Sequence, residues 1–174
     1  MKNKWLLFLI IGIVLIVVIA LIIYLINKKE DSDEPPIKGK EIKDIKNLHY
    51  SYSVGYAMYA YYTYDIECED KCTIKIKPNG YPDEEAKTYD VSDDKMNDII
   101  SVLNKYEVSK WDGYNKSDKN VLDGNSFSFS LTTKDGASVS AHGYMMWPKH
   151  YREVREELTS IFDSFIKEGD FKKQ

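Results

Sequence analysis

The stretch HYSYSVGYAMYAYYTYDIECEDKC, residues 49–72, decides the fold of this chain. It contains seven of the 14 tyrosines and both cysteines. From Tyr50 to Cys68 every second residue is apolar or aromatic, and the residues between them are mostly small or polar. Strict alternation with period two predicts a β-strand with one buried face. Because the run is long for one strand, we expect a bulge or a break at Gly55.

The next segment, CTIKIKP at residues 72–78, alternates in the same way and predicts an antiparallel hairpin with the end of the first stretch. A three-residue loop places Cys68 opposite Cys72 and, on the other face, Asp65 opposite Lys75. A shift by one residue would mix the two faces. Directly opposed Cα atoms on antiparallel strands lie about 4.5–5.5 Å apart, within disulfide range. We therefore expect a Cys68–Cys72 disulfide, with two free core cysteines as the alternative.

Further along the chain the pattern changes from strand to helix. AKTYDV at residues 86–91 alternates as a short third strand, and Ser92 then occupies the N-cap position of a helix. The apolar residues that follow fall at helical spacing and predict one buried stripe. This stripe consists of Met96, Ile99, Ile100, Leu103 and Tyr106.

A second hairpin is predicted over SFSFSLTTKDGASVSAHGY, residues 126–144. A three-residue loop, with Gly136 in the left-handed conformation, opposes Leu131 to Val139, whereas a two-residue turn opposes Leu131 to a serine. The first arrangement matches apolar to apolar residues, so we prefer it. Pro148 then begins a second amphipathic helix, because proline is favoured at the first helical position.

The predicted order is β-β-β-α-β-β-α, an α+β fold with an antiparallel sheet of about five strands and two helices on one face. One N-terminal transmembrane helix precedes it. Residues 5–26 form an unbroken apolar run of 22, about 33 Å long as a helix, which is enough to cross a bilayer. Trp5 and Tyr24 lie at its ends, where the membrane interface favours such rings. The alternatives, a core helix and a signal peptide, are disfavoured by the all-round apolar surface and the missing cleavage site.

Two observations place the domain that follows the anchor outside a cell membrane. The N-terminal flank carries one more positive charge than the C-terminal flank, and a disulfide needs an oxidising compartment. The charged segment after the anchor, with its Pro-Pro pair, predicts a linker without a core of its own. The predicted division is a flank at 1–4, a transmembrane anchor at 5–26, a linker at 27–46, a globular domain at 47–168 and a charged tail at 169–174.

Charge and motif content argue against several classes of function. Residues 31–174 carry 20 Lys and Arg against 27 Asp and Glu, a net −7, which disfavours nucleic acid and anionic lipid as partners of the domain. None of the three histidines has a partner at the spacing of a catalytic triad or a metal pair. An EF-hand fails because Leu122 and Asp123 fall at a ligand position and at the glycine position, although a looser calcium loop stays open. We identify no catalytic residue, no metal ligand and no cofactor motif.

Aromatic residues are the one feature in excess, at 13% of the chain. The alternation assigns the even-numbered tyrosines to the core. Tyr59 and Tyr61 fall on the other face, where they either pack under a loop or form an exposed platform for a sugar ring or peptide. The loop at 109–125 adds two more rings, and loops on a rigid sheet often hold sites. The candidate ligand-binding residues are Tyr59, Tyr61, Trp111, Tyr114 and Trp147, with packing as the alternative for the tryptophans.

One part of the chain, roughly residues 106–165, resembles a pattern in small uncharacterised membrane-anchored proteins of low-GC Gram-positive bacteria. The pattern reads WDGYNKSDKNVLDGNSFSFSL, then DG, then GYMMWPKHYREV. The residues that carry it are Trp111, Gly113, Asp123, Gly124, Gly143, Trp147, Pro148 and Tyr151. The resemblance implies no activity, so it transfers no catalytic role.

The sequence supports three hypotheses for function. The first is a single-pass membrane protein, held in the bilayer by residues 5–26, with an extracytoplasmic domain that binds a wall, carbohydrate or protein partner. Tethering raises the effective concentration, so modest affinity suffices. The second is an enzyme acting on surface polymers through the loop carboxylates Asp112, Asp118 and Asp123, which would have to converge in a cleft. The third is a structural subunit of a membrane complex, which a large exposed apolar patch would favour.

Overall fold

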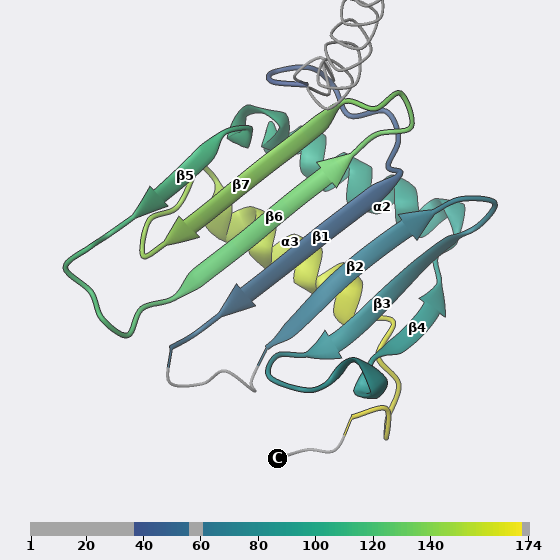
Figure 1. Ribbon diagram of the computed structural model, residues 1–174. Helices are drawn as coiled ribbons and strands as arrows, with labels where there is room; N and C mark the ends of the chain where they lie inside the picture. Colours follow the sequence, from purple (N-terminus) through teal and green to yellow (C-terminus); the bar gives the residue numbers. More distant parts are fainter. Residues whose placement is uncertain (1–36, 56–60, 172–174) are drawn as a thin grey trace, which may run out of the picture. The chain divides into compact units, whose positions relative to one another are not determined.

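The computed structural model describes residues 37–55 and 61–171, which form an α+β domain (Figure 1). Seven strands make one sheet in the order β4-β3-β2-β1-β6-β7-β5. Figure 1 shows helices α2 (Asp93–Lys105) and α3 (Tyr151–Asp163) on the same face of this sheet. The strands are β1 (Asn47–Ser53), β2 (Tyr62–Cys68), β3 (Cys72–Pro78), β4 (Lys87–Asp90), β5 (Tyr114–Ser117), β6 (Ser126–Thr132) and β7 (Ser138–Tyr144).

The tyrosine-rich stretch is a hairpin and not one long strand. Gly55 separates two strands, β1 and β2, which pair antiparallel with Tyr50 opposite Tyr64. Even-numbered residues therefore still face even-numbered residues, and this face is buried, as the alternation predicted. The first strand also pairs with β6, which places it at the centre of the sheet.

The two predicted hairpin registers are confirmed. Strands β2 and β3 pair with Cys68 opposite Cys72 and Asp65 opposite Lys75. The two cysteine sulfurs lie at disulfide distance, 2.04 Å apart. Strands β6 and β7 pair with Leu131 opposite Val139, and Gly136 in their turn has φ +87°. The expected N-cap of α2 is also present, because the Ser92 hydroxyl accepts a hydrogen bond from the backbone of Lys95 at 3.4 Å.

The sheet has seven strands and is mixed, where about five antiparallel strands were expected. One added strand comes from the reversal between β1 and β2. The other is β5, which lies in the predicted loop 109–125 and pairs parallel to β7. It is four residues long and largely exposed, so it carries no buried alternating pattern from which it could be recognised. It is held by backbone pairing at the edge of the sheet.

The predicted linker at 27–46 does not hold for residues 37–46. Three isoleucines of this segment, Ile37, Ile42 and Ile45, are buried in the domain core. Asn104 on α2 fixes the segment with two hydrogen bonds: its side-chain oxygen accepts from the backbone N–H of Ile42, and its amide donates to the Ile42 carbonyl, both at 2.8 Å. Isolated isoleucines in a charged segment thus serve as anchors into a core that the rest of the chain supplies.

The predicted tail at 169–174 is also packed over part of its length. Asp170 accepts a hydrogen bond from the Tyr89 hydroxyl at 2.7 Å, and the ring of Phe171 lies 5.2 Å from that of Tyr62. Within 37–55 and 61–171, no helix is both long and apolar enough to cross a membrane. The predicted anchor at 5–26 lies outside the described residues.

Candidate binding groove

The groove begins where the chain passes from β7 into α3. The helix begins at Tyr151 and not at Pro148, because Pro148 starts a turn whose carbonyl accepts from the Tyr151 backbone at 3.2 Å. His150, at the N-cap, has a left-handed backbone with φ +61°. This turn brings Trp147 back over the helix start, where its ring stacks on Tyr151 with centroids 4.7 Å apart and planes 16° apart. Trp147 remains 37% exposed.

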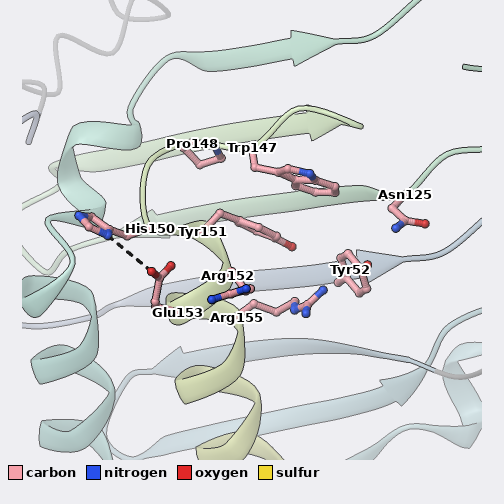
Figure 2. Close-up of a pocket in the computed structure, with 9 residues that line it drawn as sticks. All are labelled: Tyr52, Asn125, Trp147, Pro148, His150, Tyr151, Arg152, Glu153 and Arg155. Carbon is pink, nitrogen blue, oxygen red and sulfur yellow. Dashed lines mark ion pairs between the residues drawn. The ribbon is translucent and has the colours of Figure 1, made fainter. Parts of the chain in front are cut away.

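A pocket of about 420 Å³ opens beside this stacked pair (Figure 2). Figure 2 shows Trp147 and Tyr151 on one side, with Arg155 reaching along the helix toward Tyr52. His150 lies 4.0 Å from Glu153, an ion pair when the imidazole is protonated. The lining residues are Tyr52, Asn125, Trp147, Pro148, His150, Tyr151, Arg152, Glu153 and Arg155.

A second pocket, of about 320 Å³, continues along α3 toward its C-terminal end. It shares Tyr52 and Arg155 with the first pocket, so the two adjoin each other at this pair. We call the two pockets together the α3 groove. The second pocket is lined by Tyr50, Tyr52, Tyr61, Tyr62, Tyr64, Arg155, Glu156, Thr159 and Asp163.

Both arginines of the chain line the α3 groove. The sequence has 22 lysines but only these two arginines, Arg152 and Arg155. The Arg155 guanidinium lies over the Tyr52 ring, 4.7 Å from its centroid, an attractive cation–π arrangement. Arg152 is 3.9 Å from Glu156, one helical turn away. Arg155, in contrast, makes no ion pair with any carboxylate in residues 37–55 and 61–171. Among the described residues, the charged group of Arg155 therefore contacts the face of the Tyr52 ring and no carboxylate.

The phenol groups in the floor of the groove are neutral hydrogen-bonding groups at physiological pH. The hydroxyls of Tyr50 and Tyr151 lie 3.2 Å apart and are buried. Burial raises the pKa of both phenols far above the ordinary value, because the charged form would lose its solvation. Their hydroxyls are hydrogen-bonded to each other, so these tyrosines support the floor of the groove and do not act as nucleophiles or bases.

A carboxylate closes the other end of the groove. Asp163, the last residue of α3, accepts a hydrogen bond from the Tyr64 hydroxyl at 2.7 Å. Asp163 keeps part of its surface exposed, yet partial desolvation raises its pKa, and the Tyr64 hydrogen bond opposes that rise only partly. No Lys, Arg or His of the described segments forms an ion pair with it. The α3 groove thus has a cation near its N-terminal end and a carboxylate near its C-terminal end.

The structure separates the five aromatic residues proposed from sequence. Trp147 and Tyr61 line the groove, each 37% exposed, and Tyr61 meets Tyr52 edge-on at 4.9 Å. Trp111 is only 3% exposed, and its indole N–H donates to the Lys149 carbonyl at 3.1 Å, so it supports the turn from beneath.

The remaining two candidates lie elsewhere. Tyr114 is half-buried on the edge strand β5, with its ring 6.3 Å from Phe127, and does not line the groove. Tyr59 lies outside the described residues. Packing, the alternative left open for the tryptophans, describes Trp111 fully, whereas Trp147 packs on Phe127 and Tyr151 and keeps part of its ring exposed.

Sequence reasoning missed the polar half of the groove, Arg152, Arg155 and Asp163, and assigned Tyr52 only to the core. One signal was available: the chain's two arginines stand three residues apart near the start of an amphipathic helix, in a sequence that otherwise uses lysine. Spacing alone could not show that Tyr52, from β1, meets them. That contact depends on how α3 lies across the sheet.

The three loop carboxylates proposed for catalysis have separate local roles. Asp112 accepts a hydrogen bond from the backbone of Ser140 at 3.1 Å. Asp118 accepts from the backbone of Asn120 at 2.9 Å, and Asp123 is exposed. None of the three lines the α3 groove. The enzyme hypothesis requires two carboxylates in a common cleft, and the α3 groove receives none of these three.

Several residues of the quoted sequence pattern, among them Trp147, Pro148 and Tyr151, lie at the start of α3. Gly143 shows why a small residue is needed there: a Cβ atom on it would lie 2.2 Å from the Met146 carbonyl and 2.4 Å from the Phe127 ring. The close approach lets the chain fold back so that Trp147 reaches Tyr151. Met145 and Met146 extend the exposed apolar rim beside Trp147.

Neither a metal site among the described residues nor a similar protein of known function indicates what the groove binds. Across residues 37–55 and 61–171 no group of three or more His, Cys, Asp or Glu side chains is placed to hold a metal ion. Comparison with protein-family models, curated proteins and solved structures gave no match.

Proposed function

We propose that the chain is a membrane-tethered binding protein whose extracytoplasmic domain takes an acidic ligand into the α3 groove. The proposal depends on the position and contacts of Arg155. Its guanidinium lies on the Tyr52 ring, lines both pockets and has no carboxylate partner among the residues described. A planar guanidinium binds carboxylates and phosphates through two parallel hydrogen bonds, so it suits recognition of such a group.

The surroundings of Arg155 support an acidic ligand with a flat or apolar body. Trp147 and Tyr61 expose ring surface on which a sugar ring or a peptide group can stack. Arg155 brings a positive charge without a described carboxylate partner into the groove of a domain whose net charge is negative.

The proposal also includes a membrane anchor and an oxidising compartment outside the cell. The apolar run 5–26 supplies the anchor, and the Cys68–Cys72 pair suits an oxidising exterior. The partner is then a wall polymer, a carbohydrate or a protein segment that carries carboxylate groups. Anchoring keeps the groove at high effective concentration near such partners, so a micromolar site is sufficient.

The test measures binding of two carboxylate probes to the full-length protein in detergent. The probes are N-acetyl-tetraalanine and an oligogalacturonate, each compared with its amidated, uncharged form by calorimetry. We expect the charged form of at least one probe to bind more tightly, and Arg155→Gln to weaken that binding by about tenfold or more, as for the loss of a charge-assisted hydrogen bond. Arg155→Lys keeps the charge but loses the two-pronged geometry, so it should recover only part of the affinity.

Lys149→Gln is the matched control, because it removes the same charge from an exposed neighbour that does not line the groove. It should leave binding unchanged. Equal losses in Lys149→Gln and Arg155→Gln would point to general charge attraction and contradict a site at Arg155. The proposal also fails if neither carboxylate probe binds in preference to its amide.

A further inference from the structure

The second pocket of the α3 groove has opposite charges at its two ends. Arg155, Thr159 and Asp163 follow one another at intervals of four residues, so they share one face of the helix, and all three line this pocket. At a rise of 1.5 Å per residue, the Cα atoms of Arg155 and Asp163 are separated by about 12 Å along the helix axis. A ligand lying in the pocket would meet a cation at one end and a carboxylate at the other.

The Asp163 end has the chemistry of a cation site. Its carboxylate is held by the Tyr64 hydroxyl and faces no described Lys, Arg or His partner. The rings of Tyr62 and Tyr64 lie beside it, with centroids 6.2 Å apart, and aromatic faces attract ammonium groups. It is the last residue of α3, where the negative end of the helix dipole also favours a cation. Glu156 lines the same pocket, but its carboxylate pairs with Arg152 at 3.9 Å.

We infer that the ligand of the α3 groove carries an ammonium group as well as an acidic group, and that Asp163 with Tyr62 and Tyr64 binds the ammonium. The acidic end of this ligand rests on the proposed function of Arg155. A short peptide with free termini has the required chemistry. At 3.3–3.6 Å per residue, an extended chain of about four residues spans the roughly 12 Å that separates the Cα atoms of Arg155 and Asp163 along the helix. The tyrosine rings between the ends contact the body of the peptide.

The experiment compares three forms of tetraalanine on the full-length protein in detergent: free at both termini, N-acetylated and C-amidated. We expect the free peptide to bind most tightly, with at least fivefold loss on acetylation. The Asp163→Asn variant should bind the free peptide at least fivefold more weakly than the wild type does. It should bind the acetylated peptide with the wild-type affinity. Asparagine retains an acceptor for the Tyr64 hydroxyl, and a thermal unfolding curve for each variant checks that the fold is intact.

Glu168→Gln, which removes an exposed carboxylate outside the groove, is the matched control and should leave all three affinities unchanged. The inference is overturned if acetylation does not weaken binding, if Asp163→Asn loses no affinity for the free peptide, or if no form of tetraalanine binds. If Arg155→Gln still weakens binding of an acidic probe in any of these cases, the proposed function stands and only the ammonium site is lost. If Arg155→Gln leaves binding unchanged while Asp163→Asn weakens it, the ammonium site stands and the proposed function of Arg155 is lost.

Discussion

The carboxylate of Asp163 accepts a hydrogen bond from Tyr64, yet burial raises its pKa above the ordinary value for an aspartate. A raised pKa means that the folded protein binds the proton more tightly than the unfolded chain does. The stability linked to this group is therefore fully present below the unfolded pKa and is lost as the pH rises through the folded pKa. A residue whose ionisation opposes folding is typical of a site where function and stability compete.

Asp163→Asn is therefore expected to raise the thermal midpoint slightly at pH 7 and to leave it nearly unchanged at pH 3. At the lower pH the wild-type carboxyl is protonated in both states, so the substitution removes no charge. Thermal unfolding of both proteins at the two pH values, followed by circular dichroism, makes the measurement. A lower midpoint for the variant at pH 7 would show that the Tyr64 hydrogen bond outweighs the cost of burial.

Asn104 is a second residue whose role extends beyond its own helix, because its amide pairs with both backbone groups of Ile42. Asn104→Ala should lower the free energy of unfolding by about 2 kcal/mol, at about 1 kcal/mol for each hydrogen bond lost. Urea unfolding of the variant and of Asn97→Ala, an exposed asparagine on the same helix, provides the comparison. Equal effects in the two variants would mean that the 37–46 segment is held by its isoleucines alone.

Among the elements, the hairpin of β2 and β3 depends on a very short covalent loop. Replacing both Cys68 and Cys72 with serine should lower the free energy of unfolding by about 2 kcal/mol or less, since the loop entropy that the bond removes grows only with the logarithm of loop length. Unfolding of the oxidised protein, the reduced protein and the double variant gives this value. Alkylation and mass measurement of freshly isolated protein checks the pairing, and free thiols would contradict it.

The elements also explain how the groove is held open. Strand β1 lies at the centre of the sheet and supplies Tyr52, while the turn between β7 and α3 supplies Trp147. Trp111 packs beneath Tyr151 with ring centroids 6.0 Å apart, so a buried ring fixes the first residue of the helix. The rings that line the groove are therefore held by packed elements, which limits the side-chain entropy that is lost when a ligand binds.

For the whole molecule, the proposal places residues 31–174 outside the cell membrane. Treatment of intact cells with protease should then remove the domain, whereas a cytoplasmic marker should remain uncut. The expectation rests on the one-charge excess at the N-terminal flank and on the cysteine pair. A domain that stays intact while known surface proteins are cut would reverse the orientation, and with it the class of partner.

The sequence by itself determined the features that depend on local periodicity. Alternation with period two specified which face of the longer strands β1, β2, β3, β6 and β7 is buried, and this in turn specified the pairing of Cys68 with Cys72 and of Leu131 with Val139. A slip by one residue would have exposed every apolar side chain, so only one register was acceptable. The cap at Ser92 was recognisable for a similar reason, because capping involves residues only a few positions apart.

Only the tertiary structure decided the features that depend on distant contacts. Burial of Ile37, Ile42 and Ile45 needs a core that other segments build, and β5 is specified by backbone bonds to β7, which carry no side-chain pattern. The α3 groove joins Tyr52 of the first strand to Arg155 of the last helix. A local pattern records which face of an element is buried but not which element lies across from it, so the groove could be found only once the helix was placed on the sheet.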